Sequence, residues 1–174
     1  TSPPHYGSST SPFVTYSWDG SRQLVGFTYN NGYPTVNFTY DSLGNVTNIT
    51  NSWSGAWSYT YNGFDLLTVT DNIGTEWTYA YTDTNNPHSP TTITDGGGRS
   101  WTRTYNQYGQ VLTVVPPTGS PMGTTTYEYE ETSSDPAFGY LRKITNGAGD
   151  EETFDSYSPL GDILERSTSP SSGI

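Results

Sequence analysis

Two clusters of carboxylates are the residues of this chain whose chemistry could hydrolyse a bond. They occupy residues 128–131 and 150–152, and paired carboxylates at a suitable separation hydrolyse glycosidic bonds. On a strand, however, Glu128 and Glu130 share one face and their tyrosine neighbours share the other, which is typical of a solvated face. We expect residues 150–152 to lie in a turn. The carboxylate pattern therefore favours surface charge over a glycosidase site.

Nucleophilic catalysis needs a base held beside a nucleophile, and the chain offers few bases. Its two histidines are His5, in a Pro/Ser-rich segment, and His88, between prolines. Neither lies in a motif that would orient the ring, and cysteine is absent. We predict a protein that is not an enzyme and that uses no cofactor.

Calcium is a more plausible ligand than a catalytic metal, because it binds oxygen ligands from loops. Asp71, Asp83, Asn85 and Asp150 are expected in loops, but no Asp-x-Asp-x-Asp spacing occurs. Asp and Asn also stabilise turns by accepting hydrogen bonds from nearby backbone N–H groups. The pattern favours turns, and we predict no metal site.

Exposed aromatic rings can stack on the apolar faces of sugars. Trp57, Trp77 and Trp101 recur at equivalent positions, which favours a core role for them. Trp53 instead follows Asn51 in a turn and is predicted to be exposed. It is our candidate sugar-stacking residue.

Three Asn-x-Thr sequons begin at Asn37, Asn45 and Asn48 and are candidate glycosylation sites. Chance is an alternative explanation, because the chain is rich in Asn and Thr. The Pro/Ser/Thr-rich ends could also carry O-linked glycans.

A repeated motif accounts for most of the chain. A turn with Thr-Asp or Thr-Asn and a nearby glycine precedes an aromatic strand that alternates with period two, most clearly from residues 50, 70 and 94. A repeat of this length indicates stacked units rather than one deep cleft. The aromatic residues predicted to form the repeat core are Trp57, Tyr59, Tyr61, Trp77, Tyr79, Tyr81, Trp101 and Tyr105.

A second motif follows each aromatic strand and carries a family resemblance. It reads Tyr-x-x-x-Gly or Asp, then any residue and Val, Leu or Ile, at residues 40–46, 61–67, 105–111 and 157–163. These copies resemble YD repeats, also called RHS repeats. The resemblance implies β-hairpin ribbons that coil in a spiral and that, in long members of the family, close into a shell around a toxin.

The predicted fold is therefore all-β, with antiparallel β-hairpin repeats coiled into a short spiral or solenoid-like ribbon. Residues 1–12 form a Pro/Ser/Thr-rich terminal segment, residues 13–168 a YD-type repeat domain of about six copies, and residues 169–174 a C-terminal tail. Residues 82–90 and 130–140 are expected to be longer surface loops.

Charge and composition limit the partners. Six basic residues against seventeen acidic ones give a net charge of −11, which disfavours nucleic acid and anionic membranes. No apolar run is long enough to span a bilayer. Abundant Thr, Ser, Gly and Tyr with few Lys favour an extracellular or cell-surface location.

We predict a non-enzymatic extracellular structural protein that assembles head to tail with other copies of itself, for example into a filament. One alternative is a carbohydrate-binding module, with polysaccharide or covalent glycan as its partner. The other is a fragment of an RHS-type toxin-encapsulating shell.

Overall fold

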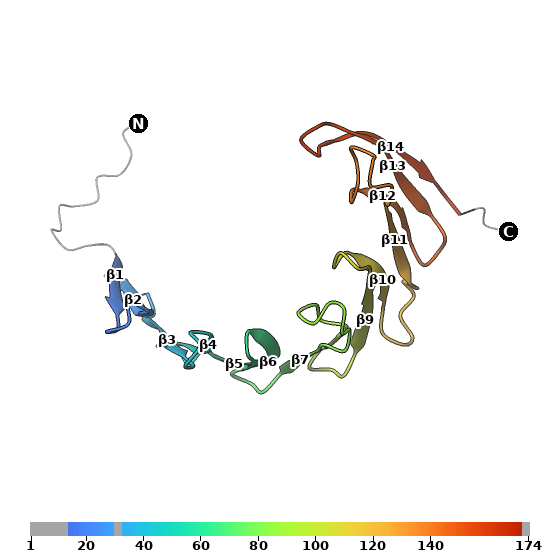
Figure 1. Ribbon diagram of the computed structural model, residues 1–174. Coiled ribbons are helices and arrows are strands. Elements are labelled where there is room, and N and C mark those ends of the chain that lie inside the picture. Colours follow the sequence, from blue (N-terminus) through green and yellow to red (C-terminus); the bar gives the residue numbers. More distant parts are fainter. Residues whose placement is uncertain (1–13, 30–32, 172–174) are drawn as a thin grey trace, which may run out of the picture. The chain divides into compact units, whose positions relative to one another are not determined.

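The computed structural model describes residues 14–29 and 33–171, and all regular elements in these residues are β-strands (Figure 1). The all-β prediction is confirmed. The strands are β1 (Val14–Trp18), β2 (Leu24–Tyr29), β3 (Val36–Tyr40), β4 (Val46–Asn51), β5 (Ala56–Asn62), β6 (Asp65–Asp71), β7 (Glu76–Ala80), β8 (Thr92–Thr94), β9 (Ser100–Tyr105), β10 (Val111–Val115), β11 (Thr125–Tyr129), β12 (Leu141–Thr145), β13 (Glu151–Tyr157) and β14 (Ile163–Ser169).

The order of the strands in the sheet is the order in the sequence, from β1 to β14. Neighbouring strands run antiparallel, as in the β5–β6 and β13–β14 hairpins. The chain divides into two compact units, Thr1–Trp77 and Thr78–Ile174. Each unit is a succession of hairpins, as the repeat predicts.

Period-two alternation separates aromatic rings from hydroxyl side chains on the strands that carry both. In β5, Tyr59 and Tyr61 are half-buried, whereas Thr60 between them is exposed on the other face. The Oγ1 atoms of Thr60 and Thr68 are hydrogen-bonded at 2.7 Å across the β5–β6 hairpin. Similar Thr–Thr hydrogen bonds cross the β3–β4 and β9–β10 hairpins. Paired threonines are a favourable cross-strand combination, so both faces stabilise the pairing.

One type of turn connects most of the strands. Asp41 shows it: its Oδ1 accepts hydrogen bonds from the backbone N–H of Leu43 and of Asn45, both at 2.9 Å. The fourth residue of the turn, Gly44, has a φ of 89°, a region that glycine enters without steric cost. The same two hydrogen bonds are accepted by the side chains of Asp19, Asn51, Asp71, Asp95, Asn106, Asn146 and Ser158.

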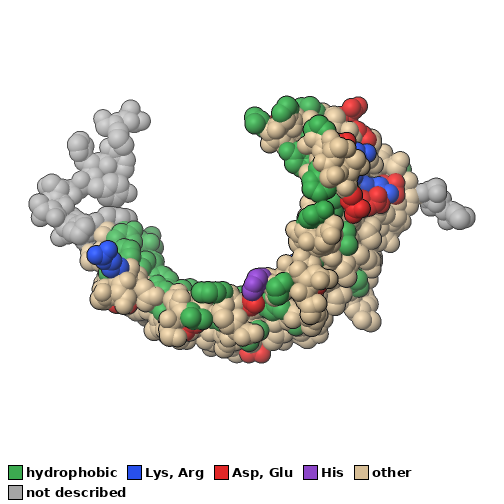
Figure 2. Space-filling view, viewed as in Figure 1, with side chains coloured by type: hydrophobic (Ala, Val, Ile, Leu, Met, Phe, Trp, Pro, Cys, Tyr) green, Lys and Arg blue, Asp and Glu red, His purple; other side chains and the backbone are tan. Residues whose placement is uncertain are grey.

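Burial is shallow throughout the described residues. No side chain there is fully buried, and Phe154, 5% exposed, is the one buried hydrophobic residue among them. Figure 2 shows hydrophobic side chains along one side of the strands of the first unit, open to solvent. Stability must therefore depend on the backbone ladder and on contacts within each face, rather than on a closed core.

Candidate functional surface

Hydrogen bonds from tyrosine hydroxyls to backbone carbonyl oxygens link consecutive hairpins. Tyr61, near the end of β5, donates its hydroxyl proton to the carbonyl oxygen of Val46, the first residue of β4, at 3.0 Å. We call this contact the tyrosine clamp. It recurs as Tyr40 to Leu24, Tyr105 to Pro90, Tyr129 to Val111 and Tyr157 to Leu141. Because each clamp joins one hairpin to the hairpin before it, the clamps hold the repeats in register.

Three of the clamp hydroxyls are held in the protonated form, which can donate. Burial raises the pKa of Tyr61, of Tyr129 and of Tyr157 above the ordinary value of a phenol. Nearby tyrosines, Tyr59 and Tyr127, raise the pKa of the first two further. Burial therefore favours the donating form of these three hydroxyls.

The sequence motif contained every clamp tyrosine except Tyr129. Tyr129 is followed by the loop at 130–140, so the Tyr-x-x-x-Gly spacing is lost there. A signal was present in the alternation of residues 125–129, which ends in Tyr-x-Tyr just as β5 does. Strand periodicity would have found this tyrosine where the turn motif did not.

Amide side chains form a second link, from turn to turn. Asn45 Nδ2 donates to the carbonyl oxygen of Gly63 at 2.8 Å, and Gln110 Nε2 donates to that of Gly139 at 2.6 Å. Asn86, which is buried, donates to the carbonyl of Asn106 at 3.1 Å. These bonds connect successive turns along one side of the ribbon within each unit.

The aromatic residues predicted to form the repeat core lie on the aromatic face, and none of them is fully buried. Trp57 and Trp77 are each 39% exposed. Trp101 is half-buried, and the guanidinium carbon of Arg99 lies 5.9 Å from its ring centroid. The predicted tyrosines are half-buried: Tyr59, Tyr61, Tyr79, Tyr81 and Tyr105.

The first unit carries a cluster of exposed rings around Trp53. Ring centroids are 6.4 Å apart for Tyr33 and Trp53, and 5.7 Å apart for Tyr29 and Tyr33. Trp53 is 66% exposed and Tyr33 is 58% exposed. Together with Phe27 and neighbouring residues they line a shallow cavity of about 490 Å³. The sequence pattern pointed to Trp53 but not to Tyr33, whose ring is brought beside Trp53 by the packing of two turns.

The three sequon asparagines lie in different surroundings. Asn37, on β3, is exposed. Asn48 is also exposed, and its Nδ2 donates to Thr39 Oγ1 at 3.0 Å. Asn45 Nδ2 donates to Asp41 Oδ2 as well as to Gly63. A glycan at Asn45 would displace a turn-to-turn bond, so Asn37 and Asn48 are the more accessible candidates.

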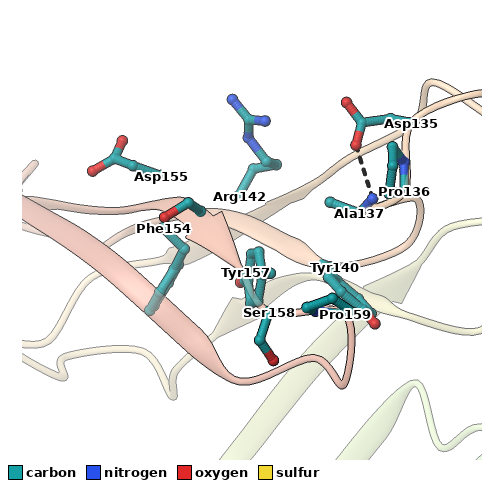
Figure 3. Close-up of a pocket in the computed structure, with 11 residues that line it drawn as sticks. Asp135, Pro136, Ala137, Tyr140, Arg142, Phe154, Asp155, Tyr157, Ser158 and Pro159 are labelled. Atoms are coloured by element: carbon teal, nitrogen blue, oxygen red, sulfur yellow. Dashed lines mark hydrogen bonds between the residues drawn. The ribbon is translucent and has the colours of Figure 1, made fainter.

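A hollow in the second unit lies between the loop at 130–140 and β13 (Figure 3). Its volume is about 320 Å³. Figure 3 shows Asp135 and Asp155 at opposite ends of the hollow, with Arg142 between them. Asp135 Oδ1 accepts the backbone N–H of Ala137 at 2.8 Å.

The carboxylate clusters of the sequence form ion pairs instead. Lys143 Nζ lies 2.8 Å from Glu128 and 3.3 Å from Glu151. Hydrogen bonds to Glu128 and then to Glu151 raise the pKa of Lys143. The expectation that residues 150–152 lie in a turn is wrong for Glu151 and Glu152, which begin β13 and pair with β12. Figure 2 shows these charges gathered over the last strands.

The loop carboxylates considered for calcium act as turn acceptors. Asp83 Oδ1 accepts the N–H of Asn85 at 2.9 Å, and Asp150 Oδ1 accepts the N–H of Ser171 at 2.7 Å. Asp71 forms the repeated turn described above. Within the described ranges, no group of three acidic, histidine or cysteine side chains is placed to hold a metal ion. His88 is exposed in its loop, and His5 lies outside the described residues.

One known family matches most of the chain. The Teneurin YD-shell family model matches residues 6–173. The chain belongs to the Teneurin YD-shell family. This confirms the resemblance to YD repeats, and it supports a structural role.

Solved structures show the same fold. The chain is similar to one in a crystal structure of TcdB2-TccC3-Cdc42, with a TM-score of 0.61 and 16% identity over 91% of this chain and 9% of that one. It is also similar to TcdB2-TccC3 without its hypervariable C-terminal region, with a TM-score of 0.60 and 17% identity over 90% and 9%. The chain thus spans about 9% of the length of these structural relatives. No curated protein matches the sequence.

The structure also bears on membrane insertion. No helix with the length and apolar character needed to cross a bilayer occurs in the residues that the structure describes.

Proposed function

We propose that this chain is a segment of a YD-type shell wall and that its role is structural rather than catalytic. The observation that supports this most directly is the sheet itself, a single layer whose aromatic face is open to solvent in the first unit although tyrosine clamps link successive hairpins. A wall segment needs a continuous connection from each hairpin to its neighbours more than it needs a closed core. The clamp and the amide links supply that continuity.

The repeat makes such a wall extendable. Each new hairpin needs only a backbone ladder, one turn and one tyrosine to attach to the hairpin before it, so stability adds up from neighbour to neighbour. The two faces differ in chemistry, because threonine hydroxyls cover one and aromatic rings the other. A wall of this kind presents a hydroxylated surface on one side and an aromatic surface on the other.

Electron microscopy of the natural protein that contains this segment tests the proposal. A hollow particle with this segment in its wall is expected. Filaments of linked copies would support the head-to-tail assembly predicted from the sequence instead, and a small monomer with a closed core would contradict both. The extracellular location is part of the same proposal, and fractionation of the producing cells tests it.

The aromatic cluster around Trp53 favours a second function, binding of carbohydrate. Two exposed rings with a centroid separation of 6.4 Å and an interplanar angle of 36° offer a platform for stacking against sugar rings. Affinity electrophoresis against a panel of polysaccharides should show retardation that Trp53→Ala removes. The matched control is Phe64→Ala, since Phe64 is 75% exposed but does not line the cavity. Equal retardation of both variants would eliminate the cluster as a sugar site.

A further inference from the structure

We propose that Asn62 is a site of spontaneous deamidation, and that the reaction releases the hydrogen bond that ties its hairpin to the turn before it. Asn-Gly pairs favour this chemistry, because glycine has no Cβ to obstruct the ring that must form. The sequence contains three such pairs, at residues 31–32, 62–63 and 146–147. The first lies outside the residues that the structure describes, so the other two can be compared. This chemistry does not depend on the wall function.

The reaction uses the peptide itself and water. The backbone nitrogen of Gly63 loses its proton and attacks the side-chain amide carbon of Asn62. The new C–N bond closes a succinimide ring, and the side-chain nitrogen leaves with a proton as ammonia. Water then adds to either carbonyl of the ring and opens it. Opening at one carbonyl gives Asp, and opening at the other gives isoAsp, in which the backbone runs through the former side-chain carbon.

The surroundings of Asn62 allow the ring to close. Asn62 is the last residue of β5, and both it and Gly63 are exposed. Its side chain takes part in none of the hydrogen bonds found among the described residues, and a Cβ added to Gly63 would meet no atom within 4 Å. Asn62 pairs with Asp65 at the turn end of the ladder, where local opening costs least. The amide carbon and the Gly63 nitrogen can therefore approach each other.

The pair at 146–147 is held in place instead. Asn146 Oδ1 accepts the backbone N–H of Ala148 and of Asp150, both at 2.9 Å, and its Nδ2 donates to Asp150 Oδ2 at 2.8 Å. Gly147 lies so close to Gly123 that an added Cβ would collide with its backbone. The hydrogen bonds of Asn146 must break before its side chain can turn toward the Gly147 nitrogen. The same dipeptide is therefore free to react in one turn and fixed in the other.

The reaction at Asn62 alters a contact between hairpins. The carbonyl oxygen of Gly63 accepts Asn45 Nδ2 at 2.8 Å, which is one of the amide links from turn to turn. IsoAsp adds a carbon atom to the backbone directly before Gly63 and displaces this carbonyl. Either product also places a carboxylate opposite Asp65, and like charges opposite each other destabilise a strand pair. Deamidation should therefore weaken the link to Asn45 and the end of the β5–β6 hairpin.

The experiment follows the full chain during incubation at neutral pH. Peptide mapping by mass spectrometry measures at each pair the mass gained when NH2 is replaced by OH, and an isoaspartyl methyltransferase labels isoAsp. We expect residue 62 to convert about tenfold or more faster than residue 146, because the hydrogen bonds of Asn146 must first break. In urea the two rates should become similar, since unfolding removes these contacts.

Three results would overturn the site. They are equal rates at residues 62 and 146 in the folded chain, an undiminished difference in urea, and no conversion of residue 62 in the folded chain over a period that converts it in urea.

An aged variant tests the structural consequence. Asn62→Gln keeps the amide, but its longer side chain would have to close a larger and less favourable ring, so its mass should not change. Hydrogen exchange in residues 41–45 should become about fivefold faster in the aged natural chain, because the bond to Gly63 is lost. Exchange in the aged Asn62→Gln chain should stay as it was before incubation. Unchanged exchange in a natural chain that has converted at residue 62 would show that the link survives the reaction, and that part of the proposal would be wrong.

Discussion

The two units use the same hairpin repeat but protect their aromatic faces differently. In the first unit the rings remain open to solvent, with Tyr16, Trp18, Tyr33 and Trp53 each more than half exposed. In the second unit the longer loops supply cover.

Loop contacts in the second unit show how this cover arises. The ring of Tyr140, at the end of the loop at 130–140, lies 4.8 Å from that of the half-buried Tyr157. Phe138, from the same loop, lies 5.4 Å from Tyr108, although Tyr108 stays exposed. The buried side chains of Asn86, Asp95 and Phe154 belong to this unit, whereas the buried residue of the first unit is a glycine, Gly26. The ion pairs of Arg99, Arg142, Lys143 and Arg166 belong to it as well.

The difference shows that the ladder and the turns suffice to form the repeat, whereas the loops decide how much of it is buried. A one-layer sheet has no opposite layer to cover its apolar face. Insertions that fold back over the rings can replace that layer locally. We expect the second unit to depend on its side-chain contacts more than the first does.

The largest expected effect comes from removing the one buried ring of the described residues. Phe154→Ala should lower the free energy of unfolding of the second unit by about 3 kcal/mol, because it leaves a cavity in place of the ring. No other described apolar side chain is as deeply buried as that of Phe154. Phe64→Ala in the first unit should change stability by less than about 0.5 kcal/mol, because its ring is 75% exposed. Urea unfolding followed by circular dichroism measures both. Equal losses would remove the proposed difference between the units.

The turns should respond alike in both units. Gly74 and Gly98 have φ angles of 84° and 77°, and an added Cβ would meet no atom within 4 Å at either. Alanine at either position should therefore cost about 1–2 kcal/mol through backbone strain alone. Gly20→Ala is the control, since Gly20 has equally open surroundings and no positive φ. Thermal unfolding that differs strongly between Gly74→Ala and Gly98→Ala would show that the turns are not equivalent.

The tyrosine clamp should have a similar strength in the two units. Tyr61→Phe in the first and Tyr129→Phe in the second each remove one hydrogen bond and leave the ring, so each should cost about 1 kcal/mol. Tyr108→Phe is a suitable control, because this exposed tyrosine lies in a turn and ends no strand. Native-state hydrogen exchange of β4 and β10 should speed up in the matching variant. No change there would show that the clamps do not hold the register.

The smallest effect concerns acid. Partial burial raises the pKa of Asp71, but the N–H donors of Thr75 and Ile73 outweigh it, and the pKa is lowered overall. A group with a lowered pKa stabilises the fold above its unfolded pKa, and this contribution is lost as pH falls through the folded pKa. Asp71→Asn should keep the turn, as Asn51 does, and flatten the fall in stability below about pH 4.

The reverse substitution, Asn51→Asp, provides the matched test. It should make the fall in stability below about pH 4 steeper, because it adds a titrating acceptor to an identical turn. Melting temperatures measured from pH 2 to 7 compare the two variants. Parallel pH profiles for both would mean that the turn carboxylates do not contribute to acid sensitivity.

Local sequence is enough to specify the strands and turns of this protein. Each turn is encoded within five residues, because Asp, Asn or Ser accepts bonds from N–H groups two and four positions later and glycine often takes the positive φ. The alternation of rings and threonines assigns the strand faces for the same local reason. These features make both the all-β repeat and the family predictable from the amino acids alone.

The groups that meet across the repeat are decided instead by tertiary packing. Tyr129 donates to a carbonyl 18 residues away. The inserted loop after Tyr129 removes the Tyr-x-x-x-Gly spacing, so the turn motif does not include this tyrosine. Tyr33 lies beside Trp53, and Phe138 beside Tyr108, because separate turns and loops pack together. Such contacts depend on strand register and loop path, which no local sequence window encodes.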